Sequence, residues 1–240
     1  RVGVEFAELF EDRQLSNDCK AAEKKLVKAA SKVYKKFLAS CPAPDAPGSK
    51  QVTALMTITG LIDAPKADKE FLSINGAQGF STFYGYYMLE AMAMAGNYQG
   101  ALDVIREYWG AMIDLGATSF WEDFDINWIP NAAPIDELVP EGKKDIHGDC
   151  GAYCYVGFRH SLCHGWASGP TSWLSRHILG VEVIEPGCRQ VRITPHLGDL
   201  QWVKGTFPTP YGELQIYHEK QANGNVISEV KAPKGVSVIK

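Results

Sequence analysis

The residues with the clearest chemical potential lie at positions 118–125, where carboxylates alternate with aromatic side chains. Glu122, Asp123 and Asp125 fall within four residues of one another. They are interleaved with three aromatic rings, those of Phe120, Trp121 and Phe124. A carboxyl group beside an aromatic wall suits sugar chemistry, because the acid moves a proton while the ring packs against an apolar sugar face. The same pattern also fits a helix-to-loop junction whose rings enter the core and whose acids face water.

A group of cysteines and histidines follows between positions 147 and 164. It consists of His147, Cys150, Cys154, His160, Cys163 and His164. Structural zinc sites use close-spaced pairs of ligands, whereas the spacings here are Cys-x3-Cys and His-x2-Cys-His. The sequence therefore favours buried thiols over a metal site, and a local disulfide from Cys154 or Cys163 is the alternative. Since no nucleophile elbow, dinucleotide fingerprint or phosphate loop is present, we expect no cofactor.

Composition and charge limit the classes of partner. The chain has 240 residues, of which 45% are hydrophobic and 22% charged, as in an ordinary globular protein. A net charge of −4 argues against nucleic acid or an anionic membrane as partner. No apolar run reaches the length of about 18 residues that spans a bilayer. Six cysteines fit either a periplasmic or a cytosolic location, and the sequence does not indicate the oligomeric state.

The first part of the chain has helical periodicity. Residues 19–37 predict a long helix capped by Asn17 or Asp18, with its lysines on a solvated face. Further helices are predicted at 50–60, 80–95, 98–115 and 162–179, the last of which is interrupted at Gly169-Pro170. Only Gly96 and Asn97 separate the helices at 80–95 and 98–115, which therefore form an antiparallel hairpin. Gly116 ends that hairpin as a C′ residue.

From Val181 onward the pattern changes to short β-branched runs separated by turns. These runs lie at 181–184, 190–194, 201–205, 213–219, 225–231 and 236–240. The predicted organisation is therefore a helical domain at 1–180, followed by an antiparallel β-sandwich at 181–240. Between the helices, residues 126–156 form an irregular stretch whose length is typical of a functional loop.

Glu122 is the carboxylate best placed for catalysis. Its neighbours Trp121 and Phe124 are expected to lower the local polarity and so raise the pKa of this carboxyl group. His164 is expected to hydrogen-bond sugar hydroxyls, next to the ring of Trp166.

Three separated motifs together resemble bacterial α-L-rhamnosidases of the inverting, (α/α)6-barrel type. The first motif that resembles the family comprises the runs 161–170 and 173–181. The second, Gly116-Ala-Thr-Ser-Phe-Trp-Glu122, looks like the family's Gly-Ala-Thr-Thr-x-Trp-Glu element. The runs 185–187, 191–195 and 200–213 are similar to the family's linker into a C-terminal β-sandwich. The motifs follow one another in the family's order and cover roughly residues 75–215.

The resemblance implies a fold, a reaction and a site. The chain would form the late helices of an (α/α)6 barrel and a C-terminal sandwich. It would help to hydrolyse terminal α-L-rhamnosyl residues with inversion, with Glu122 as the general base. The sugar subsite would be lined by His164, Trp121, Trp166, Phe80 and Trp128.

One family element is missing. Nothing here matches the acid-rich Asp-Cys-Pro-like element that holds the family's general acid, and Asp18-Cys19-Lys20 lies on an amphipathic helix. The general acid is therefore expected upstream of Arg1, in an N-terminal part of the same enzyme. Two alternatives remain: a barrel glycosidase for another deoxy or uronic sugar, and a carbohydrate-binding or structural fragment that uses sheet aromatics such as Trp202.

Overall fold

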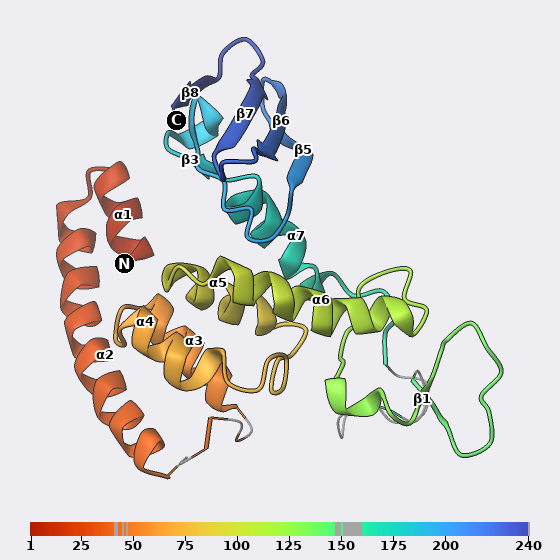
Figure 1. Cartoon of the computed structure of the whole chain (residues 1–240). Helices are drawn as coiled ribbons and strands as arrows, with labels where there is room; N and C mark the ends of the chain where they lie inside the picture. Colours follow the sequence, from red (N-terminus) through yellow and green to blue (C-terminus); the bar gives the residue numbers. More distant parts are fainter. Residues whose placement is uncertain (41–42, 45, 47, 147–149, 151–159, 240) are drawn as a thin grey trace.

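The computed structural model describes residues 1–40, 43–44, 46, 48–146, 150 and 160–239. Two helices, α1 (Val2–Leu9) and α2 (Arg13–Ser40), form a hairpin at one side of the molecule (Figure 1). The prediction that α2 is capped by Asn17 or Asp18 is wrong. The Asp12 carboxylate accepts a hydrogen bond from the Leu15 amide at 2.9 Å, so the helix begins several residues earlier.

The central helices form the hairpin expected from the sequence. Helices α3 (Ser49–Ile58), α4 (Ala64–Ala67) and η1 (Asp68–Leu72) precede α5 (Gly85–Met94) and α6 (Tyr98–Asp114). Asn97 caps α6 by accepting a hydrogen bond from the Gly100 amide at 2.9 Å, and Gly116 follows the helix with φ +89°. Helix α5 begins at Gly85 rather than near Phe80, because the preceding residues form turns.

The helical core is aromatic and rich in methionine. Its largest fully buried side chains include Trp121, Trp173, Tyr108, Phe124 and Met88. Two indole N–H groups reach carbonyls across this core: Trp109 donates to Ala167 and Trp173 donates to Leu89, each at 3.0 Å. These bonds fix the segment after residue 160 against the α5–α6 hairpin.

The described part of the connection between α6 and the next helix is largely irregular. It contains the short helix η2 (Ile126–Trp128) and two short parallel strands, β1 (Ala132–Ala133) and β2 (Lys144–Asp145). Helix resumes later than predicted. A turn, η3 (Gly165–Ala167), precedes α7 (Gly169–Trp173) and η4 (Leu174–Ile178), so Gly169-Pro170 starts the helix instead of interrupting it.

The C-terminal strands form two packed three-stranded sheets, which confirms the predicted order of helices followed by a sandwich. One sheet contains β3 (Val181–Val183), β4 (Gln190–Ile193) and β8 (Ser237–Ile239), and the turn η5 (Pro186–Cys188) joins its first two strands. The other contains β5 (Trp202–Thr209), β6 (Gly212–Lys220) and β7 (Val226–Lys231). Their shared core includes Val191, Ile193, Leu214 and Ile216. The β4–β8 pair is parallel, so the sandwich is not purely antiparallel.

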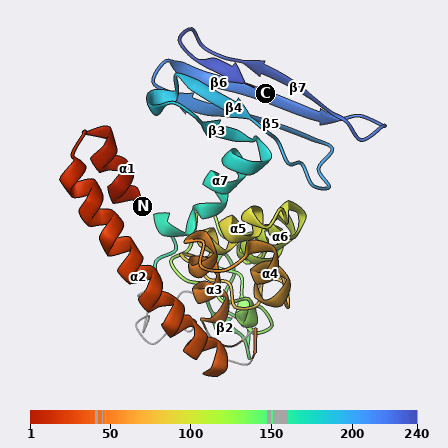
Figure 2. The ribbon, with the colours of Figure 1, turned by 90° about the vertical axis from the view of Figure 1, so that its left-hand side faces the viewer.

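Helices and sandwich meet at a polar and aromatic junction. Figure 2 shows α7 leading from the helices into the strands. The Tyr98 ring stacks on His196 with centroids 3.7 Å apart, and Arg106 bonds both carboxylate oxygens of Asp199. Gly180 has φ +72° and lies so close to Thr194 that an added Cβ would be 2.3 Å from its carbonyl carbon. The junction therefore requires glycine at position 180.

Candidate functional site

Two other chain segments hold Glu122 through hydrogen bonds. Glu122 and Ser161 are paired twice: the Glu122 amide donates to the Ser161 carbonyl at 2.8 Å, and the Ser161 amide donates to Glu122 Oε2 at 3.0 Å. The Glu122 carbonyl accepts hydrogen bonds from Thr82 Oγ1 at 2.6 Å and from Trp166 Nε1 at 2.7 Å. The segments around residues 82 and 161–166 thus fix the position of Glu122. Because the Ser161 amide also holds its carboxylate, the Glu122 side chain has limited freedom.

The Glu122 carboxyl group is half-buried and faces a histidine. Its Oε1 lies 3.9 Å from His164 Nδ1, and the two side chains are 16% and 32% exposed. This separation is too long for a direct hydrogen bond, and a water or a sugar hydroxyl between the two groups would bond to both. Since Oε2 already accepts the Ser161 amide, Oε1 is the oxygen that faces His164.

An open aromatic surface continues from this pair. The Trp166 side chain is 44% exposed. Its ring lies 4.2 Å from that of His164 and 5.7 Å from that of Phe83, centroid to centroid. A pocket of about 240 Å³ is lined by Phe83, Tyr86, Tyr87, Trp166, Ser168, Gly169 and Ser172. The sequence predicts Phe83 and Tyr87 on a buried helix, whereas Phe83 contacts Trp166 and both residues line this pocket.

Two of the predicted wall residues lie in the core. Trp121 is 0% exposed and packs edge-on against Phe124 and His160. Phe80 is 5% exposed and packs against Tyr108. Neither ring lines an open surface, which corrects the expectation of direct sugar contact. Trp128 is partly buried and packs edge-on against Phe124.

The other two acids of the stretch have local roles. Asp125 caps η2 by accepting the Asn127 amide at 2.9 Å, and Asp123 accepts the Phe124 amide at 3.0 Å. Both carboxylates therefore bond to backbone amides of the loop that follows α6. Glu122 is the acid of the three that faces His164.

His160 holds the loop that contains Asp123 through a hydrogen bond to its buried ring. Its ring is 0% exposed. Nε2 accepts the Asp123 amide at 3.0 Å, and Nδ1 lies 3.2 Å from the Ile146 carbonyl. Because an amide N–H needs an acceptor and a carbonyl needs a donor, the neutral ring must carry its proton on Nδ1. The sequence placed His160 in the Cys/His group, and its function as a support depends on tertiary contacts.

Tyr108 holds the same loop from α6. Its hydroxyl donates a hydrogen bond to the Phe124 carbonyl. Burial, and secondarily the charges of Asp123 and Asp125, raise the pKa of Tyr108 well above its usual value. The phenol therefore remains protonated and keeps its role as donor.

The Cys/His group contains no metal site within the described residues, where no three His, Cys, Asp or Glu side chains converge. His147 and Cys154 lie outside the described residues. Cys163 is exposed and forms no disulfide, which removes the bridge from this cysteine as an alternative. No helix in the described ranges has the length and apolarity needed to cross a membrane.

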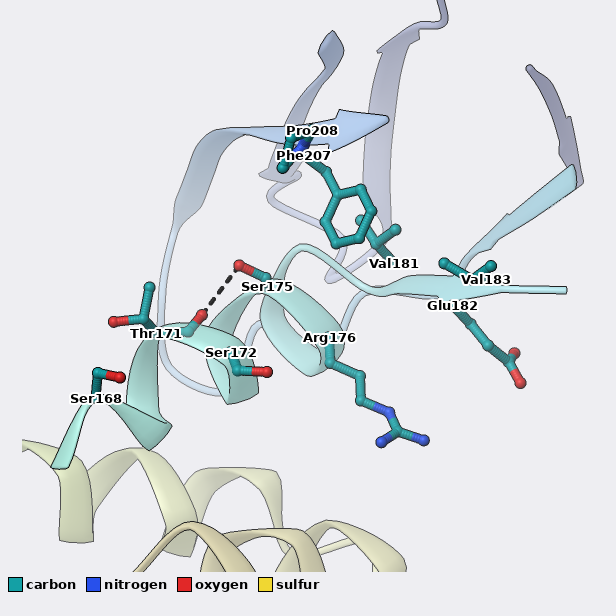
Figure 3. Close-up of a pocket in the computed structure, with 10 residues that line it drawn as sticks. All are labelled: Ser168, Thr171, Ser172, Ser175, Arg176, Val181, Glu182, Val183, Phe207 and Pro208. Atoms are coloured by element: carbon teal, nitrogen blue, oxygen red, sulfur yellow. Dashed lines mark hydrogen bonds between the residues drawn. The ribbon is translucent and has the colours of Figure 1, made fainter. Parts of the chain in front are cut away.

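A larger hollow, of about 630 Å³, lies between the last helix and the strands (Figure 3). Ser168, Ser172 and Arg176 line it from the helix side, and Phe207 lines it from β5. It shares Ser168 and Ser172 with the pocket beside Trp166, but none of the predicted site residues lines it.

The chain thus combines helical hairpins with a C-terminal β-sandwich, and it presents the Glu122 carboxylate between loops. The comparisons specify the relatives. Residues 180–239 match the bacterial alpha-L-rhamnosidase C-terminal domain. The GH78 family rhamnosidase of Bacillus sp. GL1 is 26% identical, with a TM-score of 0.59 over 79% of this chain. The resemblance to α-L-rhamnosidases is thereby confirmed.

Two further solved structures share the fold over almost the whole chain. The α-L-rhamnosidases of Aspergillus terreus and Dictyoglumus thermophilum cover 98% of it, with TM-scores of 0.69 and 0.68 and identities of 18% and 20%. The chain spans only 18% of the Bacillus protein and 26% and 25% of the other two. No curated protein matches the chain.

Proposed function

We propose that this chain provides the general-base half of an inverting α-L-rhamnosidase site. The observation that carries the proposal is the Glu122–His164 pair, in which one carboxylate oxygen is anchored and the other faces His164 across a 3.9 Å gap. The family match at residues 180–239 and the similarity to the Bacillus enzyme support the same assignment.

In this mechanism Glu122 Oε1 accepts a proton from a water molecule. The water oxygen attacks the anomeric carbon as the glycosidic bond breaks, and a separate carboxylic acid protonates the departing oxygen. Inverting enzymes place the two carboxyl groups about 6.5–9.5 Å apart, which leaves room for that water. The Ser161 amide fixes the base, so the orientation of its reactive oxygen is set before substrate arrives.

His164 and Trp166 are assigned to the sugar subsite. The imidazole is within reach of hydroxyl groups on the sugar, and the exposed indole offers a flat face to its C–H groups. A 6-deoxy sugar such as rhamnose carries a methyl group that an aromatic surface accommodates without desolvating a hydroxyl. Trp121, Phe80 and Trp128 act as supports for this surface.

The general acid is proposed to lie on a polypeptide segment outside this chain. The isolated 240-residue chain is then expected to show no turnover of 4-nitrophenyl α-L-rhamnoside. Turnover by the isolated chain that disappears in Glu122→Gln would contradict this arrangement, because it would place a complete acid–base pair within the chain.

Two alternatives are distinguished by binding. A glycosidase for another deoxy or uronic sugar would retain dependence on Glu122 but prefer a different glycoside. A purely carbohydrate-binding or structural chain would bind sugar equally well after Glu122→Gln or His164→Ala. Calorimetry with L-rhamnose on these two variants tests the second alternative, and calorimetry of the parent chain with other deoxy and uronic sugars tests the first.

A further inference from the structure

The outer face of the β5–β6–β7 sheet carries an exposed pair of aromatic rings. Trp202 on β5 is 61% exposed. Its ring lies 6.5 Å from that of Tyr217 on β6, with an angle of 28° between the planes. Trp202 is opposite Glu219 in the register, so the two rings are diagonal neighbours across the strands. The side chains next to Tyr217 on β6, Ile216 and His218, are buried in the sandwich, so the ring pair is on the solvent side.

Polar side chains surround the rings in register. Tyr217 is paired with Lys204 and Glu229, and the next row contains Thr206, Gln215 and Lys231. Six of these residues, from Lys204 to Lys231, line a hollow of about 690 Å³ on this face. Within the described residues, neither lysine forms an ion pair, so both ammonium groups remain available to a ligand.

The chemistry of this face favours a sugar over a protein. The cores of protein interfaces are depleted in charged residues, whereas here charged and amide side chains form most of the surface around the rings. The two lysines are balanced by Glu219 and Glu229, which argues against a strongly anionic ligand. Burial, followed by the nearby Glu219 and Glu229, raises the pKa of the Tyr217 phenol.

We propose that the Trp202–Tyr217 face is a second carbohydrate site, separate from the Glu122 site, and that it takes neutral pyranose rings of an oligosaccharide. One ring of the ligand stacks on the Trp202 indole, while Lys204, Gln215 and Lys231 bond hydroxyl groups of the rings that follow it along the hollow. The sheet lies at the end of the molecule opposite α3 and α4 (Figures 1 and 2). The site is argued from this sheet alone and does not rest on the proposed catalytic function.

The test is an NMR titration of the ¹⁵N-labelled 240-residue chain with L-rhamnose, maltohexaose and, as an anionic comparison, trigalacturonic acid. Trp202→Phe assigns the Trp202 indole signal. The expected result is a saturable shift of this signal with a neutral probe in the millimolar range, and a weaker response to the anionic one. Trp202→Ala and Tyr217→Ala, each followed by the backbone amide signals of β5 and β6, are expected to weaken binding by about tenfold or more.

Controls separate this site from the catalytic one. Glu122→Gln and Trp166→Ala are expected to leave the Trp202 shift unchanged. Because Trp202 is exposed, its replacement should leave the other indole signals in place and so report a folded chain. The proposal is overturned if no neutral probe moves the Trp202 signal, if the anionic probe binds best, or if binding persists in both aromatic variants.

Discussion

Replacing Tyr108 by phenylalanine tests how the loop that carries Glu122 is held. Tyr108 is 0% exposed and the Phe124 side chain is 1% exposed. The change removes the hydroxyl that donates to the Phe124 carbonyl and keeps the ring and its packing. A buried carbonyl that loses its donor without access to water costs about 1–3 kcal/mol. No large cavity is created, so this hydrogen bond accounts for most of the expected loss.

For a protein of this size, 1 kcal/mol corresponds to about 2–4 °C in Tm, so Tyr108→Phe should lower Tm by about 2–12 °C. Chemical denaturation followed by circular dichroism measures the free energy of unfolding directly, and the denaturant slope should stay constant. Tyr84→Phe is the matched control, because the Tyr84 hydroxyl makes no hydrogen bond within the described residues. Equal stability of the two variants would refute the claim that Tyr108 anchors the loop.

Two further predictions concern the junction and the sandwich. Gly180→Ala should destabilise the chain by about 2–5 kcal/mol, because the cost of a left-handed backbone and the cost of the close contact with Thr194 sum. Gly187 has φ +75° but open space around it among the described residues, so Gly187→Ala should cost only about 1–2 kcal/mol. Similar unfolding midpoints for the two variants would contradict the steric argument. Burial lowers the pKa of His218 below its ordinary value of 6.5, so the folded state binds fewer protons than the unfolded one. Its contribution to stability is therefore full above pH 6.5 and is lost as the pH falls through the folded pKa. An NMR titration midpoint of the His218 ring at or above 6.5 would contradict this.

The order of elements was predictable because it depends on local patterns. The α5–α6 hairpin, the C′ role of Gly116 and the change from helix to strand after position 180 follow from periodicity and turn residues. Glu122 and His164 were named from sequence motifs, and the structure brings their side chains together.

The orientation of the aromatic side chains was not predictable from those patterns. Trp121 and Trp166 are both tryptophans beside a site residue, yet one is fully buried and the other is 44% exposed. The difference arises from packing against His160 and Phe83, which are distant in sequence from their partners. The role of His160 was missed for the same reason, because its acceptor position is defined by the Asp123 amide.

The most direct test of the central claim is the effect of Glu122→Gln in an active polypeptide that contains this chain together with the segment that provides the acid. Asp125→Asn, an isosteric change of a nearby loop acid, is the matched control. We expect Glu122→Gln to lower kcat for an aryl α-L-rhamnoside by about 10²–10⁴-fold. We expect Asp125→Asn to stay close to the parent, and the parent to release the inverted anomer. An active Glu122→Gln enzyme, or a product of retained configuration, would contradict the account.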